Sequence, residues 1–193
     1  MTYGAADLER IFGEQLGAVA RALTALGAEY MLIGGLAVGV WAEPRATKDA
    51  DFCVHVLASA DDLCHGLAAA GLEVARGDLA RALARGEAVR LRRTIQKDEP
   101  VVVDLLLAIT PFEIDALSRR RPLQVLGVEL PVVTPEDLFV FKLIAGRPQD
   151  LADAALLYEL HAEAFDLARV HHWCREFGVE GRLAAYVSPP ERP

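Results

Sequence analysis

The sequence predicts an α+β fold, with a mixed β-sheet flanked by helices and a helical C-terminal part. Three observations lead to this prediction. Apolar residues recur at helical spacing near the N-terminus, short apolar or alternating runs between turn residues follow, and the end of the chain carries helix-start signals without strand patterns. We therefore expect a core over residues 1–133, a helical part over 134–187 packed on that core, and a proline-rich tail over 188–193.

Helices are expected where apolar residues recur every three or four positions, often with a glycine at the end of the run. The first such run ends at Gly27, and another ends at Gly71. Thr134 to Asp137 offers an N-cap residue, a proline at the first helical position and acids in the first turn. In chain order, the predicted helices span residues 5–26, 36–42, 60–70, 79–84, 135–145, 149–162, 167–177 and 183–187.

Strands are expected where a short run is apolar throughout or alternates between apolar and polar residues. Residues 30–33 form an apolar run that Gly34-Gly35 interrupts, and Phe52, Val54 and Val56 share one side of an alternating run. The polar stretch 96–100 reads as a hairpin-like connection, which predicts antiparallel pairing of its flanking strands. The predicted strands span residues 30–33, 51–57, 88–95 and 101–108, with one or two more within 123–133.

Composition excludes several classes of protein. A chain of 193 residues that is 53% hydrophobic can bury a core, which excludes a disordered chain or a disulfide scaffold. Its net charge of −8 repels nucleic acid and anionic membranes at long range, so a polyanion would need a local basic patch. Cys53, Cys64 and Cys174 leave one cysteine over from any pairing, which indicates a reducing compartment. The longest uncharged stretch, Tyr30 to Ala42, is shorter than the roughly 20 residues of a membrane helix, so we expect a cytoplasmic protein without a membrane partner.

Three aspartates and two glycines carry the chemistry. Asp49 and Asp51 alternate on a predicted strand and so face the same way, where their mutual repulsion is tolerable mainly with a divalent cation such as Mg²⁺ between them. Asp104 interrupts an apolar strand, and its charge needs a partner that the same metal could supply. Gly34-Gly35 at a strand-to-helix turn lets the backbone approach a phosphate. The structural alternatives are a solvated strand end for the paired acids, a buried ion-pair acid for Asp104 and a plain tight turn for the glycines.

This pattern resembles the signature of the nucleotidyltransferase fold, which includes DNA polymerase beta and the aminoglycoside nucleotidyltransferases. In it, an apolar-Gly-Gly segment is followed after 13 residues by Asp-apolar-Asp-apolar, with a later Asp in an apolar strand. Residues 131–153 further resemble AbiEii-type and related minimal bacterial nucleotidyltransferases, in which a Lys, an Arg and two Asp lie across two consecutive helices. Ala50 departs from the pattern, because a larger apolar residue usually separates the paired acids.

The resemblance implies the transfer of a nucleoside monophosphate from a nucleoside triphosphate to a hydroxyl of RNA, protein or a small molecule, with release of pyrophosphate. Asp49, Asp51 and Asp104 would be catalytic and would hold two Mg²⁺ ions, with Mn²⁺ as a substitute and Asp104 as the base for the acceptor. The nucleotide-binding residues would be Gly34, Gly35, Arg45, Thr47, Lys142, Arg147, Asp150 and Asp153. A snorkelling surface lysine is the alternative for Lys142, and an ion-pair network joining two helices is the alternative for the last three residues.

The resemblance also implies a place in a toxin–antitoxin or phage-defence pair, with a cognate toxin or antitoxin as partner. Two alternatives stay open: a non-catalytic or weakly catalytic antitoxin or partner-binding module, and an antibiotic nucleotidyltransferase. Between Arg76 and Lys97 the chain carries seven basic residues against two acids, by default a solvated face. Because Arg90 and Arg92 share one side of a strand next to that of Asp104, we hypothesise that this patch receives the acceptor or the triphosphate. The segment His171-His172-x-Cys174 is expected to be surface or core rather than a metal site.

Overall fold

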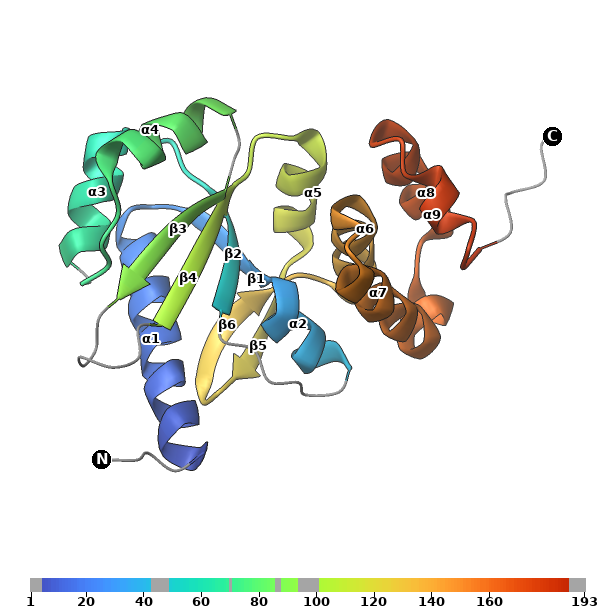
Figure 1. Ribbon diagram of the computed structural model, residues 1–193, viewed down its shortest axis with the longest axis horizontal. Coiled ribbons are helices and arrows are strands. Elements are labelled where there is room, and N and C mark those ends of the chain that lie inside the picture. The colour runs from blue at the N-terminus through green and yellow to red at the C-terminus, as the bar shows by residue number, and fades with distance from the viewer. Residues whose placement is uncertain (1–4, 43–48, 70, 86–87, 94–100, 188–193) are drawn as a thin grey trace. The chain divides into compact units, whose positions relative to one another are not determined.

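The computed structural model describes residues 5–42, 49–69, 71–85, 88–93 and 101–187 (Figure 1). The chain forms two compact units. Unit 1 comprises residues 1–37 and 45–133, and unit 2 comprises residues 38–44 and 134–193. The predicted tail over 188–193 lies outside the described residues, and the predicted packing of the helical part on the core stays a prediction.

Unit 1 is built on a mixed sheet that has six strands within the described residues, in the order β3-β4-β2-β1-β6-β5. The strands are β1 (Glu29–Ile33), β2 (Asp49–His55), β3 (Ala88–Arg93), β4 (Val101–Leu107), β5 (Arg121–Val125) and β6 (Val128–Val132). Strand β2 runs parallel to β4 and antiparallel to β1, while β1 and β6 are parallel. The two outer pairs, β3 with β4 and β5 with β6, are antiparallel. The mixed sheet and the antiparallel pairing around residues 96–100 are therefore as predicted.

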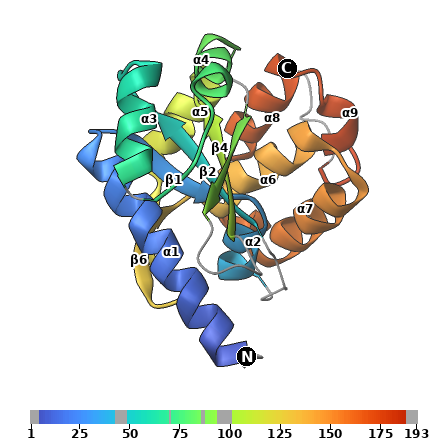
Figure 2. The ribbon, with the colours of Figure 1, turned by 60° about the vertical axis from the view of Figure 1, so that its left-hand side comes forward.

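Helices accompany this sheet because their apolar positions need a surface to bury against. They are α1 (Ala5–Ala25), α2 (Gly34–Trp41), α3 (Ala60–Ala69), α4 (Arg76–Arg85) and α5 (Pro111–Arg119). Helix α1 packs along β6 and against α3, as Figure 2 shows, and buries Leu16, Val19 and Leu23 completely. Strand β2 contributes Phe52 and Val54 to the same core. Helix α2 belongs to unit 1 through its first residues and to unit 2 from Val38 onward.

Unit 2 consists mainly of helices, which are α6 (Pro135–Ala145), α7 (Pro148–His161), the 3-10 turn η1 (Ala162–Ala164), α8 (Leu167–Glu176) and α9 (Glu180–Leu183). Thr134 caps α6 as predicted, because its side chain accepts a hydrogen bond from the amide of Asp137. Phe139 lies at the centre of an aromatic cluster whose other rings come from Tyr158, Phe165 and Tyr186. These rings join α6, α7 and the segments that follow them around one apolar centre.

The structure corrects three of the predicted elements. Helix α5 falls in a stretch for which no element was predicted. Strand β2 begins at Asp49 and ends at His55, two residues earlier than expected at each end. The last helix spans Glu180–Leu183 instead of residues 183–187. Within the described residues, none of the helices combines the length and the apolar character that crossing a membrane requires.

Candidate active site

The three predicted aspartates lie on one face of neighbouring strands. Asp51 and Asp104 are direct partners in the parallel register of β2 and β4, and Asp49 lies two residues before Asp51 on the same strand. Residues paired across strands share a face, as do residues two apart along one strand. Burial agrees with this placement, because all three aspartates are half-buried while Ala50 and Val103 between them are buried. The fold thus brings together acids that are more than 50 positions apart in the sequence.

Gly34 lies directly against one of these acids. Its φ is +68°, in the left-handed region that favours glycine, and β1 register pairs the preceding residue, Ile33, with Asp51. A Cβ atom on Gly34 would lie 2.6 Å from Cγ of Asp51, closer than real Cβ contacts come. Glycine is therefore required at this position both for its backbone conformation and for the space that the carboxylate occupies. The sequence predicted a close approach to a phosphate here but missed the contact with Asp51.

Helix α2 begins at this turn, and Gly35, its second residue, is buried. The first turn of α2 contains no acidic residue. The first amides of a helix have no partner within it, and they attract anions together with the helix dipole. An anion at the start of α2 would therefore meet favourable charge beside Gly34. Arg45 and Thr47, predicted to contact phosphate near this turn, lie outside the described residues.

The aspartates suit a hard divalent cation by their chemistry, since Mg²⁺ and Mn²⁺ prefer carboxylate oxygens. The parallel register places Asp51 and Asp104 on adjacent strands, about 4.8 Å apart. In the structure, each of the three acids already interacts with another group of the chain. No three His, Cys, Asp or Glu side chains among the described residues gather closely enough to hold a metal ion. The backbone placement fits the ion, and holding it would require the carboxylates to turn toward one another.

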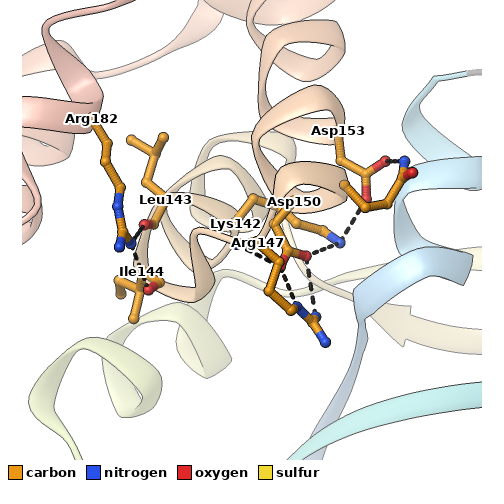
Figure 3. Close-up of polar contacts among 8 residues, drawn as sticks. Lys142, Leu143, Ile144, Arg147, Asp150, Asp153 and Arg182 are labelled. Carbon is orange, nitrogen blue, oxygen red and sulfur yellow. Dashed lines mark hydrogen bonds and ion pairs between the residues drawn. The ribbon is translucent and has the colours of Figure 1, made fainter.

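The other predicted nucleotide-binding residues form a polar network within unit 2 (Figure 3). Nζ of Lys142 donates to Oδ1 of Asp150 at 3.1 Å and to Oδ2 of Asp153 at 2.7 Å. The Lys142 side chain is only 7% exposed, and those of its two partners are 3% and 4% exposed. The side-chain amide of Gln149 also donates a hydrogen bond to Oδ1 of Asp153, at 3.0 Å. A buried ammonium group is thus matched by two buried carboxylates.

Arg147 joins this network from the surface. Its Nε and Nη2 donate to Asp150 at 2.5 and 3.2 Å, and its backbone amide donates at 3.3 Å at the start of α7. Burial would raise the pKa of Asp150, but the hydrogen bonds from Arg147 and Lys142 outweigh it and hold that pKa below its usual value. The ion-pair network that was the structural alternative is therefore present. Binding of nucleotide by Lys142, Arg147, Asp150 and Asp153 stays a prediction.

Arg182 adds a second contact to the same helix pair. Its Nη1 donates to the carbonyl oxygens of Leu143 and Ile144, at 2.5 and 3.0 Å, where α6 ends (Figure 3). These are carbonyls that a helix end leaves without partners, so the guanidinium acts as a cap from another helix. Gly146, which ends α6 with a φ of +64°, lies against this guanidinium. The turn between α6 and α7 is therefore fixed from both sides.

The histidine and cysteine segment near the C-terminus contributes to both the core and the surface. Cys174 is fully buried, and burial raises the pKa of its thiol to about 11. His172 is exposed and its ring contacts Trp173. Cys174 is therefore a core residue and His172 a surface residue, in agreement with the expected surface or core placement.

Comparisons with known proteins agree with this arrangement. A family model described as nucleotidyl transferase AbiEii toxin, Type IV TA system, matches residues 18–182. Among solved structures, that of an antigenic nucleotidyltransferase-like protein from Paracoccidioides brasiliensis is similar, with a TM-score of 0.53 and 16% sequence identity over 95% of each chain. No curated protein matches the chain. At that identity the structural likeness bears on the fold alone, and it confirms the predicted fold class.

Proposed function

Because the chain belongs to the AbiEii nucleotidyltransferase toxin family of type IV toxin–antitoxin systems, we propose that it transfers a nucleoside monophosphate from a nucleoside triphosphate to a hydroxyl acceptor. The observation that carries this proposal is the position of the Asp51 carboxylate, against Gly34 at the start of α2 and in register with Asp104. The turn offers a place for phosphate, and the acids offer ligands for cations beside it.

Each residue of the candidate site has its own role in the proposed reaction. The acceptor oxygen forms a bond to the α-phosphorus of the triphosphate while the bond from that phosphorus to pyrophosphate breaks. Asp104 takes the proton of the attacking hydroxyl, because it lies on the strand that borders β2 on the side away from Gly34. Gly34 and Gly35 let the backbone and the amides of α2 approach the phosphates. Arg45 and Thr47 add phosphate contacts in this proposal.

Asp49, Asp51 and Asp104 are the residues that would hold two Mg²⁺ ions, or Mn²⁺ in their place. Bound there, the ions would supply positive charge for the triphosphate and for the attacking oxygen. Asp49 and Asp51 share one face of β2 and repel each other, and a bound cation would reduce this repulsion, which is the physical reason to expect one. The family resemblance implies the same three ligands.

Lys142, Arg147, Asp150 and Asp153 join the proposed nucleotide-binding set through the family resemblance. The two ion pairs of Lys142 favour a second role, in which this network holds α6 and α7 in place. An ammonium group has three donors, and the structure uses two of them on carboxylates. If these residues bind nucleotide, substitution of Lys142 should lower nucleotide affinity. If the network holds α6 and α7 in place, the same substitution should lower the free energy of unfolding.

The family is one of toxin–antitoxin systems, and we propose a cognate antitoxin as the biological partner. A non-catalytic or weakly catalytic partner-binding module and an antibiotic nucleotidyltransferase remain as alternatives. None of the contacts among the described residues favours either alternative over nucleotidyl transfer to a macromolecular acceptor. The transfer assay below separates all three.

The proposal is tested by incubating the protein with Mg²⁺, each of four α-phosphate-labelled nucleoside triphosphates, and separate RNA, protein and aminoglycoside acceptors. Labelling of a macromolecular acceptor is the expected result, and it should be lost when Asp49 is changed to Asn. Asp78→Asn is the matched control, because Asp78 is an exposed acid of α4 whose carboxylate pairs with Arg81. Labelling that survives Asp49→Asn would contradict the proposed site, and labelling of an aminoglycoside alone would favour the antibiotic alternative.

A further inference from the structure

Helix α2 carries the proposed phosphate-binding turn but has little helical stability of its own. It is eight residues long, and three of them are glycines, at Gly34, Gly35 and Gly39. Isolated helices shorter than about 12 residues are marginal in water, and glycine is among the least favourable residues inside a helix. The first turn of α2 contains no acidic residue and the last turn no basic one, so its own side chains do not complement the helix dipole. The helix therefore depends on contacts with other parts of the chain.

The last residue of α7 makes such a contact at the C-terminal end of α2. Nε2 of His161 donates a hydrogen bond to the carbonyl oxygen of Trp41 at 2.6 Å. Because a carbonyl oxygen can only accept, the imidazole carries a proton on Nε2. The rings of the same two residues also pack edge to face, with centroids 5.9 Å apart and planes at 83°. Both residues belong to unit 2, and both are half-buried.

This hydrogen bond satisfies a group that a helix end leaves open. The last carbonyls of a helix have no partner within it. At the end of α2, the carbonyl of Val38 accepts from the amide of Ala42 at 2.8 Å, and that of Trp41 accepts from His161. His161 is therefore a C-terminal cap that another helix supplies. Gly34 begins the same helix about 10 Å away, at a rise of about 1.5 Å per residue.

We propose that His161 is a positioning residue for nucleotidyl transfer. By capping the C-terminal end of α2, it keeps the amides of the first turn of that helix directed at the phosphates of the triphosphate. His161 acts through α2 and not by contact with the triphosphate. This inference rests on the proposed function, because it places the triphosphate at the start of α2. A purely structural role, in which His161 only stabilises unit 2, would leave triphosphate affinity unchanged.

The test compares three single variants with the wild type. His161→Leu removes the hydrogen-bond donor, whereas His161→Gln keeps an N–H group that reaches the Trp41 carbonyl. His172→Leu is the matched control, because His172 also contacts a tryptophan ring, that of Trp173, but lies exposed on α8. Hydrogen exchange of the peptide over residues 34–42 reports on α2, and urea unfolding reports on the whole fold. Isothermal titration with each nucleoside triphosphate in the presence of Mg²⁺ measures triphosphate affinity.

We expect exchange over residues 34–42 to be about fivefold faster in His161→Leu than in the wild type, which is the effect of losing one hydrogen bond. The dissociation constant of the triphosphate should rise about threefold, because the triphosphate binds only molecules in which α2 is ordered. His161→Gln should recover most of both losses, and His172→Leu should match the wild type in both measurements. If His161→Leu does not fold, His161→Asn replaces it, since its side chain is polar but too short to reach the Trp41 carbonyl.

Three results would overturn the inference: unchanged exchange over residues 34–42 in His161→Leu, faster exchange there without a loss of triphosphate affinity, or a His161→Gln variant as impaired as His161→Leu. The second result would leave His161 with a structural role alone. Failure of the proposed function would be visible separately, as a wild type that binds no triphosphate with Mg²⁺. That result would contradict the transfer reaction and the positioning role with it, whereas equal triphosphate affinity of the wild type and His161→Leu would contradict the positioning role alone.

Discussion

Gly34 and Asp51 constrain each other at the centre of the candidate site. The glycine adopts a φ of +68°, and the Asp51 side chain fills the space where a Cβ atom would be. Because Asp51 also pairs in register with Asp104, a shift of this one carboxylate would disturb both the turn and the row of acids. The sequence predicted a functional Gly34-Gly35 turn and a functional Asp51, but it could not place one against the other, since 16 residues separate them in the chain.

Gly34→Ala should therefore cost more stability than the backbone conformation alone explains. We expect a loss of about 2–4 kcal/mol, combining left-handed strain with overpacking. Gly27→Ala is the matched control, because Gly27 has a φ of +66° but nothing within 4 Å of an added Cβ. It should lose about 1–2 kcal/mol. Urea unfolding measures both values, and equal losses would contradict the contact between Gly34 and Asp51.

Lys142 neutralises two buried carboxylates, so its removal should leave uncompensated charge inside unit 2. We expect Lys142→Met to reduce the free energy of unfolding by about 3–5 kcal/mol. Adding Asp150→Asn and Asp153→Asn to this variant should recover much of the loss, because the remaining buried groups of the network are then neutral and Arg147 is exposed. Urea unfolding tests both variants. A loss below about 1 kcal/mol would instead assign Lys142 mainly to ligand binding.

Acidification should weaken the same network. The pKa of Asp150 is held below its usual value in the folded state, so its ionised form stabilises the fold at neutral pH. This contribution is complete above the ordinary aspartate pKa and is lost as the pH falls through the lowered one. Unfolding free energies measured from neutral pH down to about pH 3 should therefore fall more steeply for the wild type than for Asp150→Asn. Parallel curves would contradict the assignment.

At the scale of elements, most helices and strands followed from apolar periodicity, because each buries one face against the sheet or a neighbouring helix. Helix α5 was missed because it lies between two strands and carries a short apolar pattern. Its signal is nevertheless in the sequence, as Thr110, Pro111 and Glu113 form a capping box with a proline at the first position. The Glu113 carboxylate accepts hydrogen bonds from the amides of Ile109 and Thr110, both at 2.9 Å.

Substitution of the cap should show how far α5 depends on it. Thr110→Ala removes the oxygen that accepts from the Glu113 amide and should cost about 1 kcal/mol. Thr110→Ser keeps that oxygen, and because serine is at least as good an N-cap as threonine it should change the stability little. Chemical denaturation of the two variants provides the comparison. If serine and alanine were equally destabilising, the hydroxyl would not be the stabilising group.

Strand register is the part of the candidate site that the sequence could not provide. Alternation placed Asp49 and Asp51 on one face, and the polar connection at 96–100 predicted that the strand of Asp104 pairs with the strand before it. Neither pattern tells that β2 and β4 are neighbours, nor in which register the strands pair. The pairing of Asp51 with Asp104, and of Asp104 with Arg90, comes from long-range contacts between β2, β4 and β3. The structure also shows that Lys142 pairs with Asp150 and Asp153. The apolar periodicity of its helix had left open whether this side chain is exposed or binds a ligand.

For the molecule as a whole, the net charge and composition limit which ligands the surface attracts, and the fold determines where particular charges gather. A net charge of −8 disfavours nucleic acid over the surface in general, yet Arg90 of β3 pairs in register with Asp104. The family match extends over residues 18–182 and so includes both units. The acids and glycines of unit 1 are therefore the proposed centre of nucleotidyl transfer, with an anionic donor on one side and the acceptor on the other.

The most direct test of this account is the thermal stability of the protein with each of the four nucleoside triphosphates, with and without Mg²⁺. A ligand that binds the folded state raises the unfolding temperature by mass action. We predict a Mg²⁺-dependent rise with at least one triphosphate, lost in Asp51→Asn and kept in the exposed control Asp78→Asn. A rise that persists in Asp51→Asn, or no rise in the wild type with any triphosphate, would contradict the proposal that these acids form a metal-dependent nucleotide site.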